Sequence, residues 1–470
     1  MNRAALLLIV CLAVTCPRAR TQGNSPGPTT PEAQVRLGNE YLDKKDYSSA
    51  MIWFRKAGEK NNAAAQNNIG WLYESGFGVK QDYAEALNWF SKSANQGNAD
   101  AQNNIGWLYE NGWGVLQDYS EAMTFYRKAA DQGNSRAEAN IGGLYDKGLG
   151  VKQDYVEAMV WYRKAADQGD TNAQVNEGWL YQHGWGVKQD YAEALSLYLG
   201  AANKKNPYAE NDIGTLYEAG LGVKQDYAEA MAWYYRAATQ GHAKAQGNIG
   251  RLYDNGRGVE QDYAKAADWY RKAAEQGDAE AETNLGLLYL KGHGLKQDYS
   301  EAMNWFHKAE EQGNADAQSN IGWIYQNGLG VPQDNNEAMK WYGKAADRGN
   351  GRAIANLLAL SQTPDAGGTI IRVCSEGNKS GCATPPRATF APDPEFSKQA
   401  RDAKYQGTCL LMLTVGADGV PKNVRVIKSV GMGLDEKAVE AVQKWKFDPG
   451  MKDGQPVAVE LAVEVDFHLK

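Results

Sequence analysis

The stretch ADAQNNIGWLYENGWGVLQDYSEAMTFYRKAADQGN, residues 99–134, decides the fold, because close copies of it recur every 36 residues. Its first half carries Ala101, Ile105 and Leu108 at the spacing of one helix face. Gly112 then breaks that helix, since glycine adopts a left-handed backbone cheaply. A second apolar pattern of helical period follows in the same unit. Each unit therefore predicts two helices joined by a short loop.

The period is marked by a tyrosine after a Gln-Asp pair, where the aspartate is placed to cap the second helix. This tyrosine stands at Tyr83, Tyr119, Tyr155, Tyr191, Tyr227, Tyr263 and Tyr299, and Asn335 takes its place in the last unit. Small residues recur in the same register, as at Ala101 and Gly106, where they let two helices approach closely. Such strict self-similarity predicts an α-solenoid.

Composition shifts along the chain predict six segments. They are a signal peptide (1–20), a disordered lead-in (21–31), an N-terminal cap repeat with shorter spacing (32–62), the repeat solenoid of eight full units and a capping helix (63–361), a Pro-rich linker (362–394) and a small α+β domain (395–470). The fold class is mainly α. Leu358 replaces the repeated glycine in the last helix, as expected of a cap on which no later repeat packs.

The repeat resembles the Sel-1-like repeat family, a subclass of the tetratricopeptide superfamily with a longer loop between its two helices. The segment 32–62 resembles an ordinary tetratricopeptide unit. The resemblance implies a groove lined by the first helix of each repeat, in which an extended peptide or a partner helix lies.

The candidates for this groove are residues that vary between repeats while the scaffold residues stay constant. They are Asn67, Trp71, Asp100, Asn103, Trp107, Trp179, Asn211, Arg251 and Trp323. A tryptophan can anchor a ligand while an amide addresses its backbone. The alternative is that these tryptophans merely cover the neighbouring helix.

The overall composition argues against several classes of protein. The 470 residues include 50 Lys+Arg against 57 Asp+Glu and are 43% hydrophobic, which fits neither a disordered chain nor a nucleic-acid binder. The five histidines show no metal-ligand spacing, and no serine or cysteine carries a nucleophile motif. We therefore expect no enzyme, no metal and no cofactor.

The N-terminus predicts export. One early cation at Arg3 precedes an apolar run that is too short to span a bilayer comfortably. A periplasmic location is the main expectation; a lipid anchor at Cys16 and an uncleaved membrane anchor are the alternatives. In an oxidising compartment Cys374 and Cys382 could form a disulfide, or remain two unpaired thiols, and Cys409 is expected to be a buried thiol.

The C-terminal region predicts a helix over 395–405, strands over 408–415 and 422–430, a helix over 434–446 and one long strand over 455–469. The last strand alternates apolar and acidic residues. Its pattern, with the Asp418-Gly419 turn and the run Trp445-Lys446-Phe447-Asp448-Pro449, resembles the C-terminal domain of the TonB family.

That resemblance implies docking to an outer-membrane transporter, whose extended segment adds to a sheet edge. The candidate edge residues are Val457, Val459, Glu460, Leu461, Val463, Glu464 and Val465. The alternative is that this strand is buried in the middle of the sheet.

Three functions remain open. The preferred one is a periplasmic scaffold with protein partners in the cell envelope, in contact with membranes only through them unless the N-terminus is retained. The second is a TonB-type energy transducer for nutrient uptake, although the apolar run carries no histidine and a solenoid replaces the Pro-rich spacer typical of that family. The third is a cell-wall-associated regulator.

Overall fold

The computed structural model describes residues 29–361 and 383–468. The N-terminal segment expected to be a signal peptide, Cys374 and Cys382 lie outside these residues. The chain divides into two compact units, Met1–Ala201 and Ala202–Lys470, and each is described by itself.

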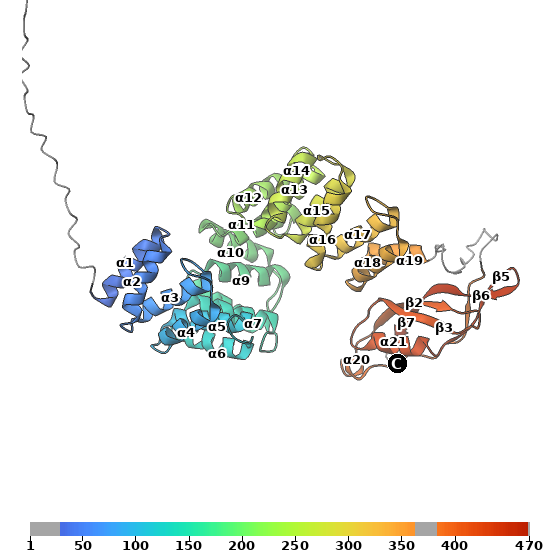
Figure 1. Cartoon of the computed structure of the whole chain (residues 1–470), viewed down its shortest axis with the longest axis horizontal. Coiled ribbons are helices and arrows are strands. Elements are labelled where there is room, and N and C mark those ends of the chain that lie inside the picture. Colours follow the sequence, from blue (N-terminus) through green and yellow to red (C-terminus); the bar gives the residue numbers. More distant parts are fainter. Residues whose placement is uncertain (1–28, 362–382, 469–470) are drawn as a thin grey trace, which may run out of the picture. The chain divides into compact units, whose positions relative to one another are not determined.

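The first unit is a stack of paired helices (Figure 1). They are α1 (Pro31–Asp43), α2 (Tyr47–Gly58), α3 (Ala63–Ser75), α4 (Tyr83–Ala94), α5 (Ala99–Asn111), α6 (Tyr119–Ala130), α7 (Ser135–Lys147), α8 (Tyr155–Asp167) and α9 (Thr171–His183). The boundary between the two units falls within α10 (Tyr191–Asn203).

The predicted start and stop signals act as expected in the repeat over 99–134. The carboxylate of Asp118 accepts hydrogen bonds from the backbone N–H groups of Ser120 and Glu121, at 2.9 and 3.0 Å, and caps α6. Gly112 ends α5 with a left-handed φ of 69°. Within α5, a Cβ on Gly106 would lie 2.7 Å from the ring of Tyr126, so only glycine allows α5 and α6 to pack this closely.

Adjacent repeats are also tied by side chains at fixed sequence separations. The Gln132 amide donates to Gln102, 30 residues earlier, at 2.7 Å. The Asn134 amide donates to Asp100, 34 residues earlier, at 2.9 Å. The core between them consists of small and apolar residues, among them the fully buried Ala137.

The second unit continues the solenoid and adds the strand-rich domain. Its helices are α11 (Pro207–Ala219), α12 (Tyr227–Thr239), α13 (Ala243–Asn255), α14 (Tyr263–Ala274), α15 (Ala279–Lys291), α16 (Tyr299–Glu311), α17 (Ala315–Asn327), α18 (Asn335–Asp347), α19 (Gly351–Ser361), α20 (Lys398–Asp402) and α21 (Leu434–Val442). Its strands are β1 (Arg387–Phe390), β2 (Gly407–Val415), β3 (Pro421–Lys428), β4 (Lys446–Asp448), β5 (Gly450–Lys452), β6 (Gln455–Val457) and β7 (Val459–Phe467). The predicted class, a helical solenoid followed by a small α+β domain, is confirmed.

The central sheet has the antiparallel order β3-β2-β7, and β2 is buried on both faces. On one face Leu411 and Leu413 form a core with Leu434 of α21. On the other face Met412 packs in a cluster that includes Leu357 of α19. The last solenoid helix, expected to be a cap on which no later repeat packs, is covered instead by this sheet.

Four predicted elements differ in the structure. The helix expected over 395–405 is confined to α20, and the helix expected over 434–446 ends at Val442, after which Lys446 begins β4. The expected linker contains β1, which pairs with β4. The expected single strand over 455–469 is two strands, since β6 pairs with β5 while β7 pairs with β2. The reason is the turn at Asp453 and Gly454, both with positive φ, which closes the β5–β6 hairpin and places Val457 outside β7.

Candidate functional site

The first unit contains a groove of about 560 Å³ along the first helices of consecutive repeats. It is lined by the predicted residues Trp71, Asn103 and Trp107. Helices α3, α5 and α7 present these positions in register, because each repeat places the same helix face on the same side. Thus the structure brings together three of the nine predicted groove residues.

The predicted amides form a ladder between repeats. Asn104 donates to Asn67 at 3.1 Å, and Asn140 donates to Asn103 at 2.9 Å, each across 37 residues. In the second unit Asn248 donates to Asn211 at 3.0 Å. The Oδ1 atoms of these predicted residues are therefore committed to neighbouring repeats.

The predicted tryptophans belong to aromatic clusters. Trp107 meets the loop residue Trp113 edge-on at 4.4 Å between ring centres, and Trp113 in turn lies 4.9 Å from Tyr83 of the preceding repeat. Trp179 makes the same contact with Trp185 at 4.5 Å. The rings of Trp107 and Trp179 thus pack against loop tryptophans, and the clusters also present a half-exposed aromatic surface.

The groove carries a row of carboxylates that the sequence reasoning missed. The hydroxyl of Tyr126 donates to Glu110 at 2.6 Å, and the hydroxyl of Tyr162 contacts Asp146 at 3.4 Å. Burial raises the pKa of Asp146, against the opposing effects of Tyr162 and Lys147. The row could have been found, because a tyrosine follows the carboxylate by 16 residues in both repeats.

Glu74 is the exception in this row. The residue 16 positions later is Phe90, so no phenolic hydroxyl faces its carboxylate. Burial raises the pKa of Glu74 to about 7. The groove therefore holds a carboxyl group that changes charge near neutral pH.

The remaining predicted groove residues lie elsewhere. Asp100 is exposed at the edge of its repeat, where it binds Asn134, and Trp179 does not line the groove. In the second unit Arg251 forms a two-pronged ion pair with Glu218, and Trp323 is 41% exposed.

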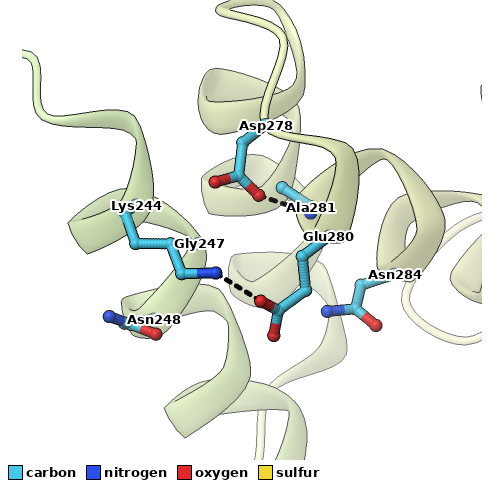
Figure 2. Close-up of a pocket in the computed structure, with 7 residues that line it drawn as sticks. All are labelled: Lys244, Gly247, Asn248, Asp278, Glu280, Ala281 and Asn284. Atoms are coloured by element: carbon cyan, nitrogen blue, oxygen red, sulfur yellow. Dashed lines mark hydrogen bonds and ion pairs between the residues drawn. The ribbon is translucent and has the colours of Figure 1, made fainter. Parts of the chain in front are cut away.

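A smaller hollow lies in the second unit at a position where the asparagine ladder lacks one side chain (Figure 2). Gly247 stands at the position of Asn103 and Asn211, so Asn284 faces no side-chain amide there. Lys244 and Glu280 form an ion pair beside it (Figure 2). On the same measure of empty space, this hollow holds about 170 Å³ and the groove of the first unit about 1300 Å³.

In the C-terminal domain, β7 lies at one edge of the three-stranded sheet. It carries the predicted residues Val459, Glu460, Leu461, Val463, Glu464 and Val465. Val459 and Val465 face the core, whereas Glu464 is exposed. Since the other edge of β7 pairs with no described strand, every second residue directs its backbone N–H and C=O groups outward.

The edge is supported by two polar contacts on the sheet. Glu460 forms an ion pair with Arg425 of β3 at 3.1 Å across β2, and Thr408 donates to Asp466 at 2.5 Å. Burial raises the pKa of Glu460, and Arg425 opposes that shift. The first contact ties β7 to β3 and the second ties it to β2, and neither uses the outer edge of β7.

Cys409 is buried, as predicted, and its thiol contacts Asp435 at 3.4 Å. Burial and this carboxylate raise the pKa of Cys409 to about 12. Burial alone would raise the pKa of Asp435, but hydrogen bonds from Ser429, Val430 and Gly431 hold it below its usual value. Asp435 therefore anchors the loop before α21, while the thiol is held in its neutral form.

Within residues 29–361 and 383–468, no group of histidine, cysteine and carboxylate side chains is arranged to hold a metal ion. No helix in that part of the chain is both long and apolar enough to cross a bilayer.

Sequence comparison identifies the same two parts of the chain, the helical repeats and the C-terminal domain. The Sel1 repeat profile matches nine segments, which together cover residues 31–350: 31–62, 63–98, 99–134, 135–170, 171–206, 207–242, 243–278, 279–314 and 315–350. The chain belongs to the Sel1 repeat family. The first segment, expected to be an ordinary tetratricopeptide unit, is matched by the same profile as the other eight. A second profile, for the Gram-negative bacterial TonB protein C-terminal, matches residues 392–469 of this Sel1 repeat protein.

Curated relatives match the C-terminal domain alone. The protein tonB2 of Pseudomonas aeruginosa is 37% identical over 79 residues, which are 17% of this chain and 29% of that protein. The protein TonB of Vibrio cholerae is 32% identical over 78 residues, 16% of this chain and 32% of that protein. The Sel1 repeat protein thus spans about a third of the length of these relatives.

Solved structures match the repeats. A Sel1 repeat protein from Oxalobacter formigenes is 36% identical with a TM-score of 0.47, covering 51% of this chain and 96% of that chain. The protein c5321, a protective antigen present in uropathogenic Escherichia coli strains, is 33% identical with a TM-score of 0.41, covering 72% of this chain and 81% of that chain.

Proposed function

We propose that this Sel1 repeat protein is a non-enzymatic scaffold of the periplasm. The solenoid groove holds one protein partner, and the C-terminal domain docks a protein of the outer membrane or envelope by strand addition. Sel1 repeats together with a TonB C-terminal domain point to protein partners in the cell envelope. The observation that carries the proposal is the presence of two candidate surfaces, the groove and the outer edge of β7, which share no residue.

The β7 edge suits an extended segment with little sequence preference. Its outward N–H and C=O groups can pair with any backbone, while side chains such as Glu464 select weakly among partners. Because β2 holds β7 along its whole length, from Val459 to Phe467, the edge is ordered before a partner arrives. Less conformational entropy is then lost on binding.

Site-specific photo-crosslinking in intact cells tests this function. A photoreactive residue at Glu464 on β7 should give adducts with an outer-membrane or envelope protein, and one at Asn172 on the groove rim should give adducts with a different protein. The same residue at Lys428, on the opposite edge strand β3, is the matched control. Equal adducts at Glu464 and Lys428, or none at either surface, would count against the scaffold.

The TonB match keeps energy transduction as the second candidate. That function requires a retained N-terminal anchor, whereas the scaffold is an exported, processed chain. The intact mass of the protein from separated periplasmic and membrane fractions distinguishes them. A soluble chain lacking roughly the first 20 residues supports the scaffold; a full-length chain in the inner membrane supports the transducer.

A further inference from the structure

The tryptophan row of the groove has a gap. The positions equivalent to Trp107 in the first unit are Trp71, Gly143 and Trp179. The residue four positions before Gly143 is Ala139, where the two preceding repeats have Asn67 and Asn103 and the following repeat has Val175. Both small residues line the groove. A Cβ added to Gly143 would meet only the Tyr162 hydroxyl, at 3.7 Å, so the site is open. We call the recess at Ala139 and Gly143 the notch.

At the notch, the chain does not supply the side-chain partners that the same positions provide in other repeats. Ala139 offers Asn176 no side-chain oxygen, although Asn140 has such a partner in Asn103. The loop residue that folds over the tryptophan elsewhere is Leu149, which supplies no aromatic ring. The notch therefore has Trp107 as one wall and Tyr162 at its floor.

The charge around the notch is acidic. Glu74, Glu110, Asp146 and Asp170 line the groove, against the two cations Arg136 and Lys147, which are both exposed. Asp146 lies three residues after Gly143 and thus on the same helix face. Partial burial of Asp146 and Glu74 makes their charged forms costly, and a cation placed beside them offsets that cost.

We propose that the notch receives a lysine or arginine side chain from a protein segment lying along the groove. Its aliphatic stem packs against Trp107 and its charged end lies at Asp146 and Glu110. This inference rests on the proposed function, since it specifies the partner of the same groove. An acidic or purely apolar side chain would bring no cation to these carboxylates beyond the exposed Lys147, which acts on Asp146.

The notch can be filled without departing from the repeat pattern. Gly143→Trp restores the residue found at Trp71, Trp107 and Trp179, and it replaces a glycine inside a helix, so the variant should fold at least as stably as the parent. Gly247→Asn is the matched control, because it restores the amide ladder in the second unit, outside the groove.

The first probe is a random dodecapeptide library displayed on phage and selected on the full chain. The expected result is enrichment of peptides with lysine or arginine in a fixed register, kept by Gly247→Asn and lost by Gly143→Trp at unchanged melting temperature. A selected peptide made with norleucine in place of that cation should bind about tenfold more weakly or worse.

Two results would overturn the proposal in different ways. If peptides without a basic residue are enriched and depend on Trp71 and Trp107, the cation preference is wrong while the groove remains a protein-binding surface. If no enrichment depends on Gly143, Trp71 or Trp107, both the notch and the proposed role of the groove are wrong.

Discussion

The hydroxyl of Tyr126 donates a 2.6 Å hydrogen bond to Glu110, whereas one repeat earlier Phe90 leaves Glu74 without such a donor. The pattern holds along the solenoid. A tyrosine stands 16 residues after a polar side chain at Tyr126, Tyr162, Tyr198, Tyr234, Tyr270 and Tyr342. Phe306 follows the apolar Leu290 by the same interval. In this series, then, tyrosine follows a polar residue and phenylalanine an apolar one, and the exception is Phe90, which follows Glu74.

Phe90→Tyr should therefore lower the pKa of Glu74 from about 7, because the new hydroxyl would stabilise the carboxylate. An NMR titration of the Glu74 carboxyl carbon measures this. Phe306→Tyr is the control, since its hydroxyl would be buried against Leu290; it should lower the free energy of unfolding by about 1–3 kcal/mol. An unchanged Glu74 pKa in Phe90→Tyr would show that the two residues do not interact.

The stability of the protein should depend on pH through Glu74. Its pKa is raised from 4.5 to about 7 in the folded state, so the folded protein binds more protons than the unfolded chain between these values. The contribution of Glu74 to stability therefore falls as pH rises from about 4.5 to about 7. Thermal unfolding of Glu74→Gln should show a gain over the parent at pH 8 that shrinks toward pH 4.5. A gain that is the same at every pH would contradict this reading.

The amide ladder should contribute to stability at Asn140 but not at Asn284. Asn140→Ala removes the donor to the buried Asn103 and should lower the free energy of unfolding by about 1–2 kcal/mol. Asn284 lies opposite Gly247, which has no side-chain amide to accept its hydrogen bond. Asn284→Ala should therefore lower the free energy of unfolding by less than about 0.5 kcal/mol. Urea unfolding of both variants makes the comparison. Equal losses would remove the ladder as a source of stability.

The docking of the sheet on α19 can be tested at Met412, which is 1% exposed in a cluster with Leu357. Met412→Ala should lower the free energy of unfolding by about 2–4 kcal/mol and weaken hydrogen-exchange protection in α19. Were this face of the sheet open to solvent, the same substitution would cost less than about 0.5 kcal/mol and leave α19 unaffected.

The helical part of the fold could be predicted closely, because caps, breakers and core residues recur in every repeat. The strands of the C-terminal domain were harder to predict from the sequence. The Asp453-Gly454 pair is a hairpin signal, yet the regular alternation from Val457 to Phe467 favoured one continuous strand. The candidate site was predicted in part: Trp71, Asn103 and Trp107 follow from their variation between repeats, but Glu110 and Asp146 were not among the predicted groove residues. Their role depends on a tyrosine in the other helix of the repeat, which helical periodicity alone does not reveal.

The hydrogen bonds between repeats join residues at fixed sequence separations, and this limits which insertions and deletions the gene can accept. Gln132 reaches back 30 residues, Asn134 reaches back 34 and Asn140 reaches back 37, and equivalent pairs recur in other repeats. Recombination that duplicates or deletes a whole 36-residue unit recreates each of these bonds at the new junction, whereas the insertion of one residue within a helix breaks several at once. The groove can therefore lengthen or shorten in steps of one repeat, and a notch such as that at Gly143 can be moved, copied or lost as a unit.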